Sequence, residues 1–60
     1  MIQIYLANGP LHGERHHLKR YQRQVDVRGY SYGPRYVHVG TALRPEVDAA
    51  GVYQFTYTGG

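Results

Sequence analysis

Turn-forming residues divide this chain into short segments, and this constrains its fold more than any other feature. The sequence "NGP" at residues 8–10, Gly13, Gly29 and the Gly-Pro pair at residues 33–34 each interrupt the segment before them. Because helices shorter than about 12 residues are marginal in water without packing support, the short segments favour strands.

The segments between these turns alternate apolar and polar residues, which is the pattern of a strand with one buried face. In residues 1–7, the side chains of Ile2, Ile4 and Leu6 share one face. We therefore predict a half-buried strand there. The same pattern predicts strands over residues 25–29, 35–40 and 52–58.

The last of these segments carries three aromatic residues on one face, namely Tyr53, Phe55 and Tyr57. A row of aromatics with a period of two is usually part of a core, and we predict that role here. The alternative is an exposed aromatic stripe, which would mark a binding surface.

Three segments lack a clear strand pattern. Residues 29–34 are predicted as a loop, and residues 41–51 as a loop with one helical turn that begins at Pro45. Residues 14–25 fit either a strand or an amphipathic helix with a basic outer face. We favour the strand because the flanking segments are strands.

Together these elements predict an all-β or β-rich protein with a single domain over residues 1–60. Its architecture would be a small antiparallel sheet or a partly open barrel of four to five strands. Parallel pairing is not expected, because a parallel connection needs a long crossover segment, usually a helix. Aliphatic residues are few, so seven tyrosines and one phenylalanine must supply much of a small core that a second molecule would complete.

The composition argues against several classes of protein. The chain contains no cysteine, which excludes disulfides and thiolate metal sites. No apolar run approaches the length of a membrane span or of a signal-peptide core, so we expect a soluble, intracellular protein that does not bind membranes. The loop "GPLHG" at residues 9–13 lacks the lysine and the hydroxyl of a phosphate-binding loop, and we interpret it as a turn.

Four histidines raise the question of a metal site. His12 and His16 are four residues apart, a spacing that converges only on a helix, whereas His16 and His17 would point to opposite faces of a strand. His38 lies on a different predicted strand. A three-histidine site completed by Glu14 is the alternative to our prediction, which is a protonatable surface without a metal or other cofactor.

Catalytic residues are not recognisable in the sequence. Ser31 is the only serine and has no acid close to it along the chain. Glu46 and Asp48 are the only closely spaced carboxylates, and they lie in a predicted loop. A chain this small also has difficulty enclosing a dry pocket. We therefore predict that the protein is not an enzyme.

The clearest functional signal is a basic segment with tyrosines among and after its cations. Five of the seven Lys and Arg residues lie within residues 15–28. Arginine beside exposed tyrosine suits either a protein interface or stacking on single-stranded bases with phosphate neutralisation. A solvated charged face is the simplest alternative. The predicted binding residues are Arg15, Lys19, Arg20, Tyr21, Arg23, Arg28, Tyr30 and Tyr32.

Several short motifs resemble a group of small proteins encoded by bacteriophages, chiefly those of actinobacteria. The motifs are "NGPLHGERHHL" after the first strand, "YVHVGT" at residues 36–41 and "VYQFTYTGG" at residues 52–60. The group has Gly-Gly-Pro-Leu-Asp-Gly after its first strand, so Asn8 and His12 here replace a glycine and an aspartate. The resemblance implies a viral origin, with the protein in the host cytoplasm or in the virion, and implies little about mechanism.

These observations lead to one functional hypothesis and one alternative. We predict a non-enzymatic, phage-type binding protein that docks on a protein partner, either a virion component or a host factor, through its Arg/Tyr surface. The alternative is a small nucleic-acid-binding module that uses residues 15–28 and their interleaved tyrosines. Both hypotheses are compatible with a homo-oligomer.

Overall fold

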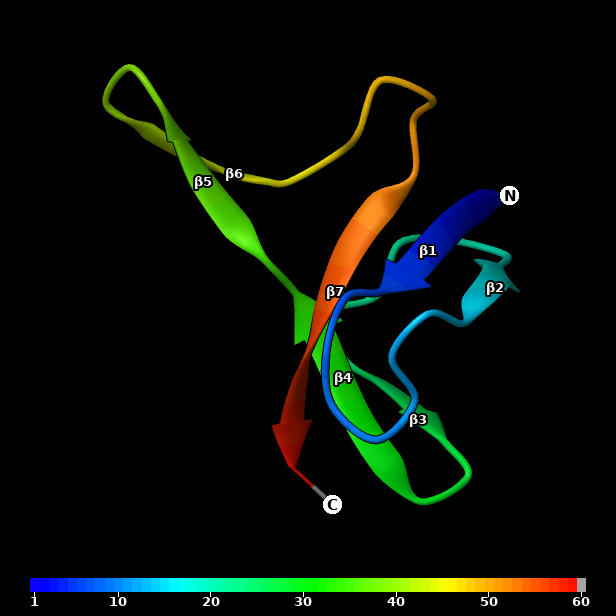
Figure 1. The fold of residues 1–60 in the computed structure, drawn as a ribbon. Helices are drawn as coiled ribbons and strands as arrows, with labels where there is room; N and C mark the ends of the chain where they lie inside the picture. The colour runs from blue at the N-terminus through cyan, green and yellow to red at the C-terminus, as the bar shows by residue number, and fades with distance from the viewer. Residues whose placement is uncertain (60) are drawn as a thin grey trace.

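The computed structural model describes residues 1–59, and its regular elements are all strands. The all-β prediction is therefore confirmed (Figure 1). Among residues 1–59 there is no helix of the length and apolarity needed to cross a membrane. The seven strands are β1 (Ile2–Leu6), β2 (Arg15–Leu18), β3 (Val25–Val27), β4 (Tyr30–Pro34), β5 (Tyr36–Val39), β6 (Ala42–Pro45) and β7 (Tyr53–Gly59).

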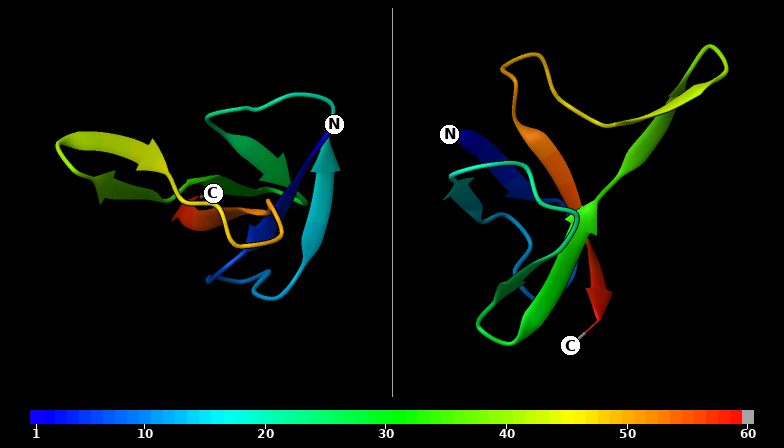
Figure 2. Two further views of the ribbon diagram at one scale, coloured as in Figure 1. Left: turned by 90° about the horizontal axis from the view of Figure 1, so that it is seen from above. Right: turned by 180° about the vertical axis from the view of Figure 1, so that it is seen from behind.

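Five of the strands form one curled sheet with the order β2-β1-β7-β4-β3, which we call the half-barrel. Its two edge strands, β2 and β3, are consecutive in the chain and are joined by the loop over residues 19–24. The other two strands, β5 and β6, form a separate antiparallel hairpin, which we call the arm. Figure 1 and Figure 2 show the arm projecting away from the half-barrel. The prediction of a partly open barrel is confirmed.

The middle of the half-barrel contains a parallel pair, so the prediction that parallel pairing is absent is wrong. Strand β1 pairs with β7 in parallel, with Ile4 opposite Tyr53 and Leu6 opposite Phe55. The need for a crossover applies to strands that one connection joins directly. Here the paired strands are the first and last of the chain, and the four other pairs in the structure are antiparallel.

Residues 29–34, predicted as a loop, belong mostly to strand β4. Arg28 and Gly29 both have positive φ, at 49° and 86°, as a two-residue hairpin turn between β3 and β4 requires. Gly33 is a site of close approach, because an added Cβ would lie 3.2 Å from the backbone oxygen of Arg23. The Gly-Pro pair thus ends strand β4 and does not form a loop.

Two further segments differ from their predicted structure. Residues 42–45 form strand β6, so the helical turn predicted at Pro45 is wrong. Pro45 is tolerated there because β6 is an edge strand of a two-stranded hairpin, where a missing N–H need not break a ladder. In residues 14–25, the favoured strand is confirmed for residues 15–18, while residues 19–24 form a loop.

The core lies on the concave face of the half-barrel. Tyr32 and Phe55 are its largest side chains, and both have 0% exposure. The Tyr32 hydroxyl donates a hydrogen bond to the Asn8 carbonyl oxygen (2.7 Å) and accepts one from the Leu11 N–H (3.0 Å). This phenol therefore ties the loop after β1 to strand β4. The buried apolar residues are Ile4, Leu6, Leu11, Val25, Tyr32, Val52 and Phe55.

Candidate functional site

The net charge of the protein is confined to one continuous segment, residues 14–28. This segment holds five cations and two carboxylates, which accounts for the whole net charge of +3. The other two cations, Arg35 and Arg44, balance Glu46 and Asp48. Residues 14–28 form β2, the loop over residues 19–24 and β3, and the exposed cations Lys19, Arg20 and Arg23 lie on that loop, which joins the two edge strands.

Four of the predicted binding residues lie together on the loop over residues 19–24. Lys19, Arg20 and Arg23 are exposed there. Tyr21 is half-buried: its ring lies 5.3 Å from the ring of Tyr53, and its hydroxyl lies 3.4 Å from the Tyr36 hydroxyl. Burial, together with the Tyr36 hydroxyl, raises the pKa of Tyr21 to about 12, so the phenol is neutral at physiological pH. Tyr21 thus connects the basic loop to the base of the arm.

Arg15 and Arg28 lie apart from this loop. Arg15 is on the convex face of β2, with its guanidinium carbon 5.9 Å from the centre of the Tyr5 ring, a cation–π contact. Arg28 follows β3 and forms an ion pair with Glu14, whose other oxygen is 2.9 Å from His16 Nε2. Arg28 and then His16 hold the pKa of Glu14 below its usual value.

The structure removes Tyr32 from the predicted binding set and leaves Tyr30 only partly accessible. Tyr32 is buried in the core and its hydroxyl bonds within the protein, so it cannot lie on a binding surface. Tyr30 is half-buried, and its ring packs edge-on to that of Tyr57 at 6.2 Å. Alternation along β4 would have suggested this burial, had the segment not been interpreted as a loop.

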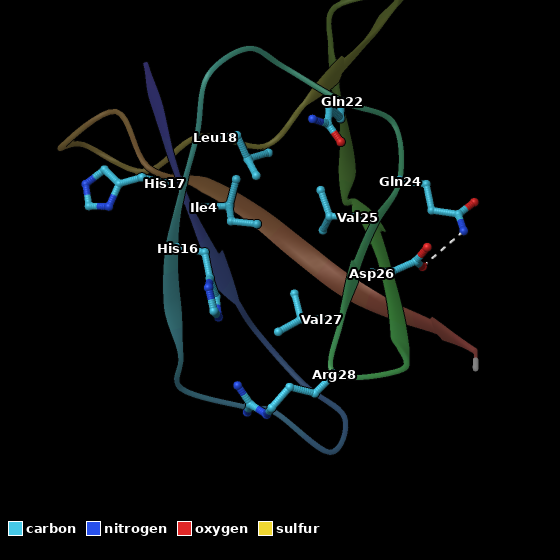
Figure 3. A pocket seen from close by; sticks show the side chains of 10 residues that line it. All are labelled: Ile4, His16, His17, Leu18, Gln22, Gln24, Val25, Asp26, Val27 and Arg28. Atoms are coloured by element: carbon cyan, nitrogen blue, oxygen red, sulfur yellow. Dashed lines mark hydrogen bonds between the residues drawn. The ribbon is translucent and has the colours of Figure 1, made fainter.

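A groove of about 620 Å³ opens between the two edge strands, β2 and β3. Figure 3 shows the side chains of Ile4, Leu18, Val25 and Val27 pointing into the space between these strands. His16 and Arg28 lie at the end nearest Glu14, and the loop over residues 19–24 spans the opposite end. The groove therefore has an apolar floor and a polar rim. It is the opening that an incomplete barrel leaves.

The arm is the second exposed feature, and sequence reasoning did not identify it as a functional surface. Every residue of β5 is exposed, and Val39 and Leu43 are 57% and 59% exposed. At its base, Arg35 Nε lies 2.6 Å from Glu46 Oε1, and the Glu46 N–H donates to the Arg35 carbonyl oxygen. Alternating valines in a strand predict a buried face, so the exposure of β5 could not be recognised from the sequence pattern.

The remaining candidate chemistry involves polar residues with local partners. In residues 1–59, no three or more His, Cys, Asp or Glu side chains gather in a way that would hold a metal ion. The Ser31 hydroxyl donates to Asp26 Oδ1 at 2.6 Å, a contact that the β3–β4 register creates between residues five apart. Ser31 and then Gln24 lower the pKa of Asp26, which makes this carboxylate a weak base.

Comparison with known proteins gives no assignment, since no protein-family model, curated protein or solved structure matches this chain.

Proposed function

We propose that the protein is a non-enzymatic binding protein that docks on another protein. The observation that carries this proposal is the arm, whose apolar side chains project from the half-barrel with little cover. Val37 and Val39 share one face of the arm, and Tyr36 and Leu43 lie on the other. Exposed apolar groups close together in a small protein mark an interaction surface. The exposed apolar residues of the arm are Tyr36, Val37, Val39 and Leu43, and Val47 follows it.

The Arg/Tyr surface predicted from the sequence contributes through its loop members. Tyr21 contacts Tyr36 at the base of the arm, so the exposed cations Arg20 and Arg23 lie on the loop that meets the apolar surface there. Aromatic and arginine side chains beside an apolar centre are the composition typical of protein interfaces. We further propose that the protein is phage-encoded and acts in the host cytoplasm or in the virion, with a virion component or a host factor as its partner.

A photo-crosslinking residue tests the docking surface directly. Placed at Val39 in the cells that naturally express the protein, it should give one dominant adduct with a defined protein, identified by mass spectrometry. The matched control position is Gln3, which is exposed on the half-barrel. The same adducts from both positions, or none from Val39, would contradict the proposal. Val37→Asp, on the same face of β5 as Val39, should abolish the adduct formed from Val39.

The confinement of the whole net charge to residues 14–28 favours a second candidate, a nucleic-acid-binding module. Binding to a labelled oligonucleotide should then weaken steeply with salt, and Arg20→Gln with Arg23→Gln should flatten the slope. We rank this candidate second because single-strand binders use exposed aromatics for stacking, and Tyr21 and Tyr32 already pack within the protein.

A further inference from the structure

We propose that the groove between β2 and β3 receives an extended, acidic segment of the partner protein, which pairs with both edge strands and completes the half-barrel. This inference rests on the proposed docking function and specifies the chemistry of the partner. Addition of a strand to a free sheet edge is a common mode of peptide recognition, in which the main chain gives affinity and alternate side chains give specificity.

The backbone of β2 presents hydrogen-bonding groups to the groove. At the start of the β1–β2 ladder, the Leu6 N–H donates to the Glu14 carbonyl oxygen at 2.9 Å. Along an antiparallel ladder, every second residue pair is joined by backbone hydrogen bonds. Counting from the bonded pair of Leu6 and Glu14, the backbone N–H and C=O of His16 point toward β1, and those of His17 point toward the free edge. Within the described chain, the sheet has no strand beyond β2.

Strand β3 presents the complementary edge. In a hairpin with a two-residue turn, the residues on either side of the turn form a backbone hydrogen-bonded pair. Arg28 and Gly29 form the turn here, so the backbone N–H and C=O of Val27 point toward Tyr30 of β4. By the same alternation, the N–H and C=O of Asp26 point away from β4. His17 and Asp26 both line the groove, so one inserted strand would find backbone partners on each side.

The floor of the groove suits the side chains of such a strand. Ile4 and Val25 are buried, whereas Leu18 and Val27 are half-buried and remain partly open to an occupant. Every second side chain of an extended segment would point to this floor, and the others would point outward. The pairing segment is short, since β2 and β3 contain four and three residues.

Charge determines which segment fits. Of the described residues that line the groove, one is a cation, Arg28, which is paired with Glu14, and one is a carboxylate, Asp26. The excess positive charge lies at one end, on the loop that carries the exposed Lys19, Arg20 and Arg23, so carboxylates on the part of the segment near this loop are favoured. The arm of a second copy is a poorer occupant, because its Arg44 would bring a further cation toward the cationic loop. The occupant we infer therefore alternates apolar and acidic residues.

The probe is an acetylated and amidated peptide of seven residues that alternates Glu and Val, titrated into isotope-labelled protein and followed by NMR. We expect shift changes at the backbone amides of His17 and Asp26 and slower hydrogen exchange there, with the arm amides unchanged. The matched control peptide has Lys in place of Glu and should bind at least tenfold more weakly.

Two variants separate the backbone of position 17 from its side chain. His17→Pro removes the N–H that points to the groove, at a position where an edge strand tolerates proline. It should weaken binding of the Glu-Val peptide at least tenfold, while His17→Ala should change the affinity less than threefold. A peptide that is N-methylated at alternate residues tests the same hydrogen bonds with the protein unaltered, and it too should lose at least tenfold in affinity.

Several results would overturn the inference. These are equal losses from His17→Pro and His17→Ala, equal binding of the Glu and Lys peptides, unchanged binding of the N-methylated peptide, or displacement of the Glu-Val peptide by a single-stranded oligonucleotide at low concentration. If no peptide binds but Val39 still crosslinks to a protein, the groove proposal fails and the docking function stands. If the peptide binds but Val39 captures nothing, the docking function of the arm fails instead.

Discussion

The half-barrel and the arm use the same sequence pattern and reach opposite degrees of burial. In β1, the alternation places Ile4 and Leu6 at 0% exposure, whereas in β5 the same alternation leaves Val39 57% exposed. The difference comes from the second layer: the half-barrel curls over its own apolar face, while the arm is a two-stranded hairpin, which is marginally stable by itself. Period-two alternation therefore indicates that one face of a strand is apolar. It does not indicate whether that face packs within the same chain or against another molecule.

The largest expected difference between the half-barrel and the arm is in the free energy of unfolding lost when one apolar side chain is truncated in each. Phe55→Ala should lower the free energy of unfolding by about 3–5 kcal/mol, because the ring is buried on the central strand β7. Val39→Ala should change it by less than about 0.5 kcal/mol. Chemical denaturation followed by circular dichroism measures both. Similar losses from the two variants would show that the arm is packed in solution and would remove the comparison.

A smaller contrast separates two phenol hydroxyls. Tyr32→Phe should cost about 1–3 kcal/mol of stability, because it removes the partner of the Asn8 carbonyl and the Leu11 N–H in the interior. Tyr36→Phe removes an exposed hydroxyl and should be nearly neutral. Thermal unfolding of the two variants under identical conditions is the measurement. A neutral Tyr32→Phe would mean that water replaces the lost bonds.

The anchor at the base of the arm should affect the arm alone. Arg35→Ala removes the contact with Glu46, so hydrogen exchange should accelerate at the amides of β5 and β6 and stay unchanged in β7. The global melting temperature should change little, because the ion pair is exposed. Faster exchange throughout the half-barrel would indicate that the two regions unfold together.

Lowering the pH should produce the smallest difference between the half-barrel and the arm. The folded-state pKa of Glu46, beside Arg35, and that of Glu14, beside Arg28, both lie below the usual 4.5. A carboxylate with a depressed pKa stabilises the fold above its unfolded pKa, and this stability is lost as pH falls through the folded value. The loss should therefore begin near pH 4.5 and continue below it. Amide shifts should show that Glu46→Gln removes the acid response of the arm and Glu14→Gln that of the groove.

The strand content of the fold was largely predictable from the sequence, whereas its assembly was not. Alternation correctly placed β1, β5 and β7, since period two follows from strand geometry. Residues 29–34 were misjudged because Gly33 and Pro34 commonly end strands, and only the close approach of the Arg23 backbone explains the glycine. The parallel pairing of β1 with β7 depends on contacts between the two ends of the chain, which leave no local pattern.

The candidate site was predictable in its charge and not in its shape. The cluster of cations over residues 15–28 is visible in the sequence, and Lys19, Arg20 and Arg23 are exposed in the structure, while their role in binding stays a prediction. The groove could not be foreseen, because it exists only where the curled sheet brings β2 and β3 to face each other. Tyr32 was misplaced because a loop was assumed where a strand buries alternate residues.

The position of β7 between β1 and β4 has a consequence for biosynthesis. A ribosome delivers the β1–β2 and β3–β4 hairpins first, and neither can join the other until the segment that lies between them has emerged. Contacts between residues so distant along the chain slow folding, because a large loop must close before they form. Each hairpin meanwhile leaves its apolar side open to solvent, so the interval before β7 (seven residues) joins them is when the chain is most exposed to aggregation and proteolysis.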